Sequence, residues 1–320
     1  MSSTLDNKNA NFGTTPVFIT AISTILGAIL FLRFGYAVGH TGLMGTFAII
    51  ILGHLVTIPT ALAVAEIATN QKVEGGGAYY IISRSFGLNI GATIGITLFL
   101  SQAISVAFYI IAFAESLIPL MNHLDTIYPE FMGSKWGGYL KDVKIIGLIS
   151  MSMLTLIILR KGANVGMKVL YLVAGILFLS LIFFFLGETK YIINEINVFN
   201  HVDGENFWVV FAIIFPAFTG IAAGLGLSGD LKDPKKSIPR GTLLATGVGI
   251  LVYFAVAVKL SLSAPLKELA SNQMVMSDIA IWGPIIPIGL ACAAISSALG
   301  SVIIAPRTLQ ALGNDDVSPF

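Results

Sequence analysis

The sequence predicts an all-α membrane protein that crosses the bilayer many times, and three observations predict it. Of its 320 residues, 56% are hydrophobic and only 11% are charged, and the mean hydropathy is +0.88. A soluble domain carries about 25% charged residues, so too few charges are present to cover a surface that faces water. Apolar windows of about 20 residues, the length that crosses a bilayer as a helix, follow one another along nearly the whole chain. A soluble enzyme and a disordered protein are therefore excluded.

Charge and motif content exclude further classes. The net charge is +1, so no basic field is present that would attract nucleic acid. The histidines lack metal-ligand spacing, and Cys292 is the single cysteine. The run Gly224-Leu225-Gly226-Leu227-Ser228-Gly229 matches a nucleotide-binding pattern, but it follows a membrane helix rather than a strand. We expect no enzyme, no cofactor and no nucleic-acid partner; the bilayer is the expected partner.

The chain divides into a short polar tail, residues 1–15, and eight expected membrane spans. The tail lacks the basic region and the cleavage site of a signal peptide, so we expect it to stay in the cytosol. Each span is a run of apolar residues, and polar or glycine-rich segments separate neighbouring runs. The spans are expected at 16–39, 43–69, 90–120, 145–160, 165–187, 207–228, 241–263 and 280–305. Residues 306–320 are expected to form a cytosolic end.

The basic residues of the loops predict the orientation. With the amino terminus inside, Lys and Arg are more frequent in the cytosolic segments, for example at Lys232, Lys235, Lys236 and Arg240, than in the outer loops. The outer loop at 188–206 is acidic, which agrees with this orientation.

The composition of two expected spans predicts that their helices are interrupted. The first span carries Gly27 between apolar residues, and the sixth carries Pro216 and Gly220 four residues apart. Proline removes a backbone donor and glycine lowers helix stability. Paired broken helices in corresponding positions indicate an inverted-repeat transporter with its binding site near the middle of the membrane. Membrane helices also tolerate glycine and proline without breaking, and for the first span this alternative stays open.

Several strings, in the same order along the chain, resemble the cation–chloride cotransporter family of the amino acid–polyamine–organocation superfamily. They are Leu30-Phe31-Leu32-Arg33, Gly75-Gly76-Gly77-Ala78-Tyr79-Tyr80, Ala112-Phe113-Ala114-Glu115, Phe215-Pro216-Ala217-Phe218-Thr219-Gly220, Ser228-Gly229-Asp230-Leu231-Lys232-Asp233-Pro234 and Ser296-Ser297-Ala298-Leu299. The resemblance implies the LeuT-type fold of two inverted five-helix repeats. Residues 16–187 would form the first repeat and 207–305 the start of the second, with the chain truncated after the eighth span.

The resemblance also implies ligands for two cations. Potassium would bind between the two broken helices, and its expected ligands are Thr24, Ile25, Tyr109, Pro216 and Thr219. Unwound carbonyls and hydroxyls can replace the hydration shell of such an ion. Sodium, in the members that use it, would bind at Ser23, Leu26, Ala293, Ser296 and Ser297. The serine pair makes sodium coupling the preferred expectation, although single hydroxyls in membrane helices often serve only packing.

Chloride and a gate complete the expected site. The two chloride sites of the family map to Gly27, Ala28 and Ile29 and to Gly220, Ile221 and Ala222. Backbone N–H groups that follow a helix break lack intrahelical partners and attract an anion. Arg33 and Glu115 are intramembrane charges that the family pairs as an outer gate.

Three functions follow from these observations. The preferred one is a plasma-membrane symporter that moves chloride with potassium and sodium. Because no expected ligand is a carboxylate, cations and chloride should bind together, which makes transport nearly electroneutral. The second is an amino-acid permease of the same superfamily, and the third is a truncated, non-transporting membrane protein. A homodimer is expected only of a full-length protein.

Overall fold

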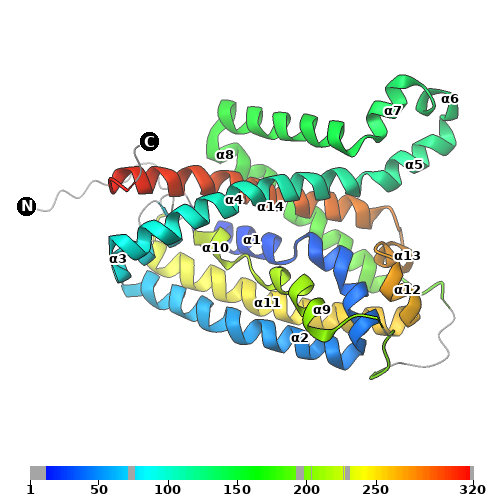
Figure 1. Ribbon diagram of the computed structural model, residues 1–320, viewed down its shortest axis with the longest axis horizontal. Helices are drawn as coiled ribbons and strands as arrows, with labels where there is room; N and C mark the ends of the chain where they lie inside the picture. Colours follow the sequence, from blue (N-terminus) through cyan, green and yellow to red (C-terminus); the bar gives the residue numbers. More distant parts are fainter. Residues whose placement is uncertain are drawn as a thin grey trace, which may run out of the picture.

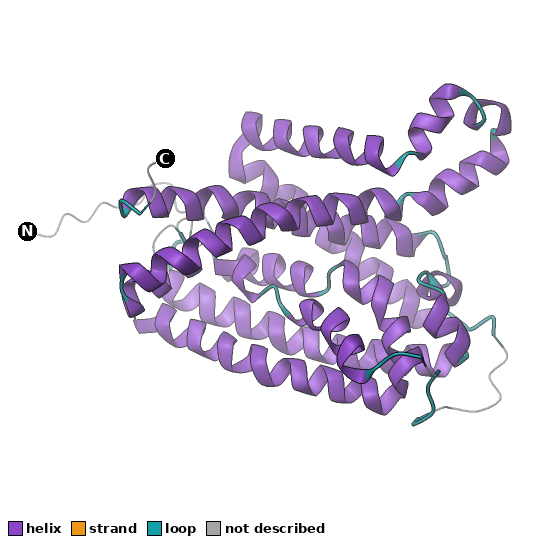
Figure 2. Cartoon of the chain, viewed as in Figure 1, coloured by secondary structure: helices purple, strands orange, loops and turns teal. Residues whose placement is uncertain are grey.

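The computed structural model describes residues 12–70, 76–191, 198–202, 204–225, 227 and 231–317, without the side chains of 123, 157–169 and 222. This part of the chain is helical, apart from its loops and one isolated bridge between Phe12 and Leu231 (Figure 2). The first helices are α1 (Thr14–Ile25), α2 (Ala28–Asn70), α3 (Ala78–Phe86), α4 (Leu88–Ser116), α5 (Ile118–Ile127), α6 (Pro129–Met132) and α7 (Lys135–Lys141). They are followed by α8 (Val143–Leu186), α9 (Phe207–Ile214), the 3-10 helix η1 (Phe215–Phe218), α10 (Ile221–Leu225), α11 (Pro234–Ser263), α12 (Leu266–Ser271), α13 (Val275–Ile279) and α14 (Ile285–Asn314).

Five helical stretches in the described residues are long and apolar enough to cross a membrane: Ala28–Asn70, Leu88–Ile127, Phe207–Leu225, Pro234–Ser263 and Ile285–Asn314. Shorter apolar helices cover Thr14–Ile25, Val143–Leu156 and Leu170–Leu186. Each expected span overlaps one of these stretches. Many of their large side chains are exposed, as expected for surfaces that contact lipid.

The first two expected spans share one long helix. The first span is α1 together with the start of α2, and the second span is the rest of α2. The two parts of α2 meet at Gly42, whose backbone is not helical (φ 68°, ψ 176°). This position is the gap expected between 39 and 43. A positive φ is strained for any residue with a Cβ, so glycine is required at this joint.

Two expected boundaries were wrong. The spans 145–160 and 165–187 are not among them: α8 contains both, and its ribbon turns back in Figure 1 to give two arms, with apolar stretches at Val143–Leu156 and Leu170–Leu186. The last span begins at Ile285 rather than 280 and continues to Asn314, so the expected cytosolic end at 306–320 is largely helical. The seventh span begins at Pro234, because proline suits the first turn of a helix. In both cases polar residues extend a helix beyond its apolar run, which a hydropathy window does not detect.

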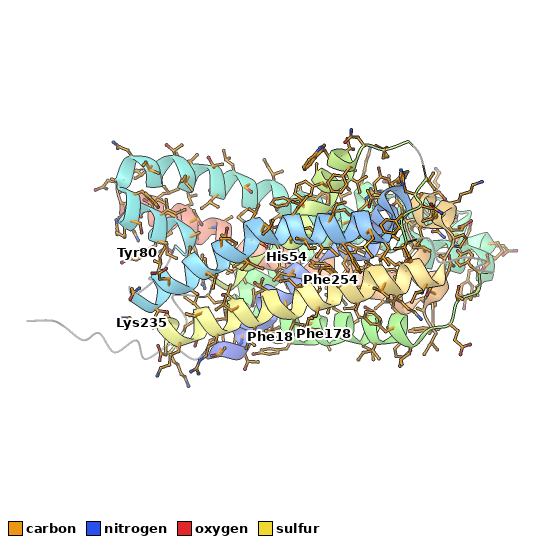
Figure 3. All side chains as sticks on the ribbon, turned by 90° about the horizontal axis from the view of Figure 1, so that it is seen from below. Phe18, His54, Tyr80, Phe178, Lys235 and Phe254 are labelled. Carbon is orange, nitrogen blue, oxygen red and sulfur yellow. The ribbon has the colours of Figure 1, made fainter. Side chains whose placement is uncertain are left out.

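The buried core lies around α1, which packs against α11, α14 and α10 next to the two helix breaks. Helices α2 and α11 run side by side in Figures 1 and 3, and α4 and α14 lie together on the other side of α1. Figure 3 places His54 of α2 and Phe254 of α11 in the middle of the bundle, with Tyr80 and Lys235 at one end. The core therefore surrounds the break between α1 and α2.

The segment that precedes α9 is hydrogen-bonded to the joint in α2. The Met44 N–H donates to the Val198 carbonyl (3.2 Å), and the Val202 N–H donates to the Gly39 carbonyl (2.8 Å). A Cβ at Gly42 would lie 2.9 Å from the Asn200 carbonyl oxygen. The two broken spans are thus connected at this end of the bundle as well as at their breaks.

Candidate functional site

The first break lies between α1 and α2. Helix α1 ends at Ile25 because Leu26 leaves helical geometry (φ −78°, ψ 46°), and its N–H donates back to the Ile22 carbonyl. Gly27 joins the two helices, and a Cβ there would lie 2.8 Å from the Thr24 carbonyl oxygen. Among the described residues, the N–H groups of Gly27, Ala28 and Ile29 have no backbone acceptor. The interruption expected at Gly27 is confirmed.

The second break lies in the sixth span. Helix α9 tightens into η1 at Phe215–Phe218, Thr219 is extended (φ −83°, ψ 179°), and Gly220 has a positive φ of 115° before α10 begins. Pro216 occupies an early position of η1, where its missing N–H costs no hydrogen bond. The interruption expected between Pro216 and Gly220 is confirmed.

The two breaks meet. A Cβ at Gly220 would lie 3.1 Å from the Ile25 nitrogen and 3.1 Å from Thr24 Cγ2. The positive φ and this close approach both require glycine. The structure therefore brings together Thr24, Ile25 and Gly220, three residues that the sequence assigned to ion binding.

A tyrosine that the sequence analysis did not single out also contacts both breaks. The Tyr253 hydroxyl of α11 lies 2.5 Å from the Ile25 carbonyl oxygen and 2.6 Å from the Ala217 carbonyl oxygen. The side chain is fully buried. The sequence offered one indication of its importance: a phenol within an apolar span needs a hydrogen-bond partner when it is buried. Nothing in the sequence indicated which residues that partner would be.

Three buried serine hydroxyls gather between α1 and α14, next to Thr20 of α1. The Ser296 hydroxyl donates to Ser23 Oγ (2.8 Å), and Ser23 Oγ donates to the Thr20 carbonyl (3.3 Å). The hydroxyls of Ser297 and Thr20 are buried without a hydrogen-bond partner. Ser297 Oγ would lie 3.8 Å from a Cβ at Gly27, so this group borders the first break. Buried polar atoms without partners are uncommon and indicate a missing ligand or water.

The remaining expected sodium residues belong to the same region. Ala293, one turn before Ser296 and Ser297 on α14, and Leu26 at the break are both fully buried. The structure thus places Ser23, Leu26, Ala293, Ser296 and Ser297 on the two elements that enclose the hydroxyls. Thr20 was missed by the sequence analysis, because a threonine near the start of an apolar span carries no signal of its own.

The hydroxyls expected to bind potassium are engaged locally. Thr24 Oγ1 donates to the Thr20 carbonyl (2.9 Å), and Thr219 Oγ1 donates to the Pro216 carbonyl (2.7 Å). A hydroxyl whose proton is donated still has lone pairs for a cation. Tyr109 of α4 packs against a cluster that includes Ala298 and Leu299 of α14, the two residues that follow Ser297. Tyr109 therefore lies nearer the serine group than to Thr219 in its contacts.

The expected gate residues are not paired. Arg33 is half-buried on α2, and Glu115 is exposed near the end of α4. Among the described residues, the ion pairs join other side chains, so the Arg33 guanidinium is not within 4.0 Å of the Glu115 carboxylate. Their role as a gate stays a prediction.

A paired charge is found instead where α3 meets the end of α14. Arg84 Nη2 lies 2.8 Å from Asp315 Oδ1, and the Tyr79 hydroxyl donates to Asp315 Oδ2 (2.8 Å). The hydrogen bond from Arg84 lowers the pKa of the Asp315 carboxyl and outweighs its burial. Burial, together with the bond to Asp315, raises the pKa of Tyr79 to about 12. The Arg84 guanidinium also lies over the Tyr80 ring, 5.1 Å from its centroid.

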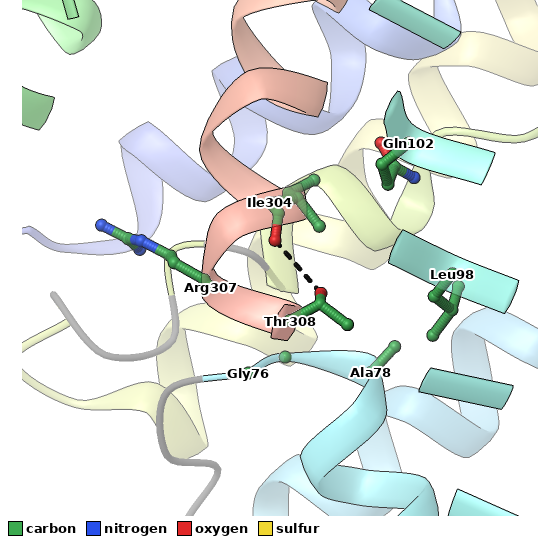
Figure 4. Close-up of a pocket in the computed structure, with 8 residues that line it drawn as sticks. Gly76, Ala78, Leu98, Gln102, Ile304, Arg307 and Thr308 are labelled. Atoms are coloured by element: carbon green, nitrogen blue, oxygen red, sulfur yellow. Dashed lines mark hydrogen bonds between the residues drawn. The ribbon is translucent and has the colours of Figure 1, made fainter. Parts of the chain in front are cut away.

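A small cavity of about 20 Å³ lies next to this charge cluster, between the start of α3, α4 and the last turns of α14 (Figure 4). Gly76 and Ala78 line one side, and Leu98, Gln102 and Thr308 line the others. The Thr308 hydroxyl donates back to the Ile304 carbonyl (3.1 Å) rather than into the space. Its size suits about one water molecule, so it is not the candidate site.

The family model for amino acid permeases matches residues 16–320. The chain belongs to the amino acid permease family. This family consists of polytopic membrane transporters rather than enzymes, so the expected helical membrane fold is confirmed.

Individual relatives in this family are solute carriers. The chain is 33% identical to solute carrier family 12 member 1 of Mus musculus over 358 residues, 94% of this chain and 32% of the relative. The match to the Homo sapiens member 1 is also 33% identical and covers 94% of this chain and 31% of the relative. Solute carrier family 12 member 2 of Squalus acanthias is 33% identical and covers 98% of this chain and 30% of the relative. The chain thus spans about a third of the length of these relatives.

Proposed function

We propose that this protein is a secondary active symporter that moves chloride together with potassium and sodium. The observation that carries the proposal is the contact between the two breaks, where Gly220 packs on Thr24 and Ile25. Breaks that meet leave carbonyl and N–H groups without their helical partners at one place inside the bundle. Carbonyls suit a cation such as potassium, and N–H groups suit an anion. The cation–chloride resemblance of the motifs supplies the identity of the ions.

The sodium part of the proposal rests on the hydroxyls of Ser23, Ser296 and Ser297. Sodium binds hard oxygen ligands at close range. Ser297 Oγ is buried without a hydrogen-bond partner, and the Ser296 hydroxyl donates a hydrogen bond to Ser23 Oγ. An oxygen cluster of this kind is incomplete without a positive ion or a water. The Thr20 carbonyl, which accepts a hydrogen bond from Ser23 Oγ, adds a further oxygen.

The chloride part rests on the N–H groups of Gly27, Ala28 and Ile29 at the start of α2, which lack backbone acceptors. The second chloride set, Gly220, Ile221 and Ala222, rests on the resemblance; the side chain of Ala222 lies outside the described residues. None of the proposed ligands is a carboxylate. Chloride next to a cation therefore supplies the balancing charge inside the membrane, and coupled uptake is nearly electroneutral.

The gate and the location complete the proposal. Arg33 and Glu115 would close the outer side when they pair, while Arg84 and Asp315 already pair at the opposite end of the bundle. This combination is what a conformation open to the outside would have. The amino terminus would lie in the cytosol, and the protein would reside in the plasma membrane, as a homodimer if a full-length protein forms one.

An amino-acid permease is the second candidate, and the family match to amino acid permeases favours it. Permeases of this superfamily bind a substrate carboxylate at a glycine-rich break in the first span. Here Gly27 stands alone between Leu26 and Ala28, which offers less room for a carboxylate than for a halide ion.

Uptake of labelled rubidium, a potassium substitute, into vesicles with the purified protein separates the two candidates. Chloride is replaced by gluconate, and sodium by choline, in separate runs; empty vesicles are the control. We expect uptake to fall in both replacements. A fall with gluconate alone would leave a potassium–chloride carrier without sodium. Rubidium uptake that ignores chloride, or accumulation of labelled amino acids instead, would overturn the proposal in favour of a permease.

A further inference from the structure

Tyr253 of α11 lies at the place where both broken spans present carbonyls that have no helical donor. The Ile25 carbonyl lost its helical donor, the Ile29 N–H, when α1 ended at the break. The Ala217 carbonyl lost the corresponding donor at the second break. Among the described residues, the Tyr253 hydroxyl is the donor to both oxygens, at 2.5 Å and 2.6 Å.

The ring of Tyr253 is held so that its hydroxyl cannot leave this position. It stacks on Phe34 with centroids 5.0 Å apart and an interplanar angle of 13°. Phe218, which belongs to η1, packs edge-on at 5.1 Å and 84°. One turn earlier on α11, a Cβ at Gly249 would lie 2.7 Å from Ile25 Cγ2, so α11 also approaches the end of α1 closely. The fully buried side chain therefore contacts both broken spans at once.

A phenol carries one proton and two carbonyls compete for it. At any moment one carbonyl receives the proton and the other presents a free lone pair to the phenol oxygen. A cation on the Ile25 carbonyl removes this competition, because the proton then goes to Ala217 and every oxygen has a positive partner. Rotation of the hydroxyl about its C–O bond is enough to move the hydrogen bond from one carbonyl to the other, and no group gains or loses a proton.

We propose that Tyr253 is a positioning residue that fastens the two breaks together and sets the Ile25 carbonyl for cation binding. The part of this proposal that concerns cation binding rests on the function proposed above. The hydroxyl transfers its hydrogen bond from Ile25 to Ala217 when the cation binds, so cation binding and the contact between the breaks depend on each other. The proposed chloride ligands are backbone N–H groups rather than these oxygens, so chloride binding depends on the hydroxyl less directly.

The test is Tyr253→Phe, which removes the hydroxyl and keeps the stacked ring. Its matched control is Thr246→Val on the same helix, whose buried hydroxyl donates only to the Thr242 carbonyl of α11 (2.9 Å). The half-saturating concentrations of rubidium and chloride are measured in vesicles. We expect Tyr253→Phe to raise the value for rubidium about tenfold, the effect of one lost buried hydrogen bond to an ion site, and to leave chloride within about twofold. Thr246→Val should change neither.

Backbone hydrogen exchange of the purified proteins gives a second readout that needs no transport. We expect faster exchange in Tyr253→Phe in the peptides that hold Leu26–Gly27 and Thr219–Gly220, and no change there in Thr246→Val. If wild-type vesicles take up no rubidium, the proposed function fails and exchange alone decides whether Tyr253 fastens the breaks. An unchanged rubidium value in an active Tyr253→Phe protein, or unchanged exchange at both breaks, overturns the inference.

Discussion

Arg84 and Asp315 join two distant parts of the chain, with Arg84 Nη2 2.8 Å from Asp315 Oδ1. Arg84 belongs to α3, which follows the second span, and Asp315 caps the carboxyl end of α14. Tyr79 donates to the other carboxylate oxygen, so one aspartate holds two residues of α3. This contact keeps α14 against the connection between α2 and α4.

The first prediction removes the charge of this aspartate. Asp315→Asn should lower the melting temperature of the purified protein, because Arg84 loses its ion pair and Tyr79 loses an ionic acceptor. The loss should be larger in low salt than in high salt, since Arg84 is partly exposed and salt screens it. Asp316→Asn is the control: its side chain is exposed, and asparagine tolerates its positive φ of 56°. Equal losses in the two variants would contradict the assignment.

The second prediction concerns acid. The pKa of the Asp315 carboxyl lies below its ordinary value because Arg84 donates to it. The folded protein therefore binds this proton more weakly than the unfolded chain does, and the stabilisation is present above the ordinary carboxyl pKa of about 3.9. It is lost as the pH falls from there through the lower folded value. Melting temperatures measured from pH 7 to pH 3 should show the difference between wild type and Asp315→Asn shrinking at the acid end, while a constant difference would contradict it.

The third prediction tests the contact between the breaks. Gly220→Ala places a Cβ at a φ of 115° and 3.1 Å from the Ile25 nitrogen, which should cost about 1–3 kcal/mol in the free energy of unfolding. Gly247→Ala is the matched control, because a Cβ there meets nothing within 4 Å and alanine favours helix. Melting of both variants in detergent checks this. A Gly220→Ala protein as stable as Gly247→Ala would show that the breaks do not pack as described.

The fourth prediction separates sodium binding from stability at the serine pair. Ser297→Ala removes a hydroxyl that has no partner, so the melting temperature should hold while the half-saturating sodium concentration rises about tenfold, as for one lost ligand. Ser296→Ala breaks the bond to Ser23 and should also cost about 1 kcal/mol in the free energy of unfolding. Sodium dependence of rubidium uptake is the measurement. Unchanged sodium dependence in Ser297→Ala would show that the serine pair contributes only to helix packing.

The sequence predicted the spans and both breaks because their signals are local. Long apolar runs predict membrane helices, and Gly27 and the pair Pro216 and Gly220 predict where helices stop. Gly42, which separates the first two spans, was expected only as a short gap. The course of α14 past residue 305 was not predicted, since polar residues such as Arg307 form helix as readily as apolar ones.

The contacts of the site were harder to predict than its position. Ser23, Ser296 and Ser297 were assigned together by resemblance, and the structure places Ser23 against Ser296. Tyr253 is more than two hundred positions from Ile25, and no short-range pattern connects them. A phenol in an apolar span indicates that a hydrogen-bond partner is needed, but only the packing of α11 on α1 shows which residue that partner is.

The joint at Gly42 affects how the two broken spans can move. The part of the first span that follows its break leads into this joint, and the chain approaching α9 is hydrogen-bonded on either side of it, through Gly39 and Met44. If the start of α2 tilts, the beginning of α9 must therefore move with it as one rigid unit. At the other end, Phe12 before α1 forms a bridge with Leu231 after α10. The breaks would then act as paired pivots between two joined pairs of segments.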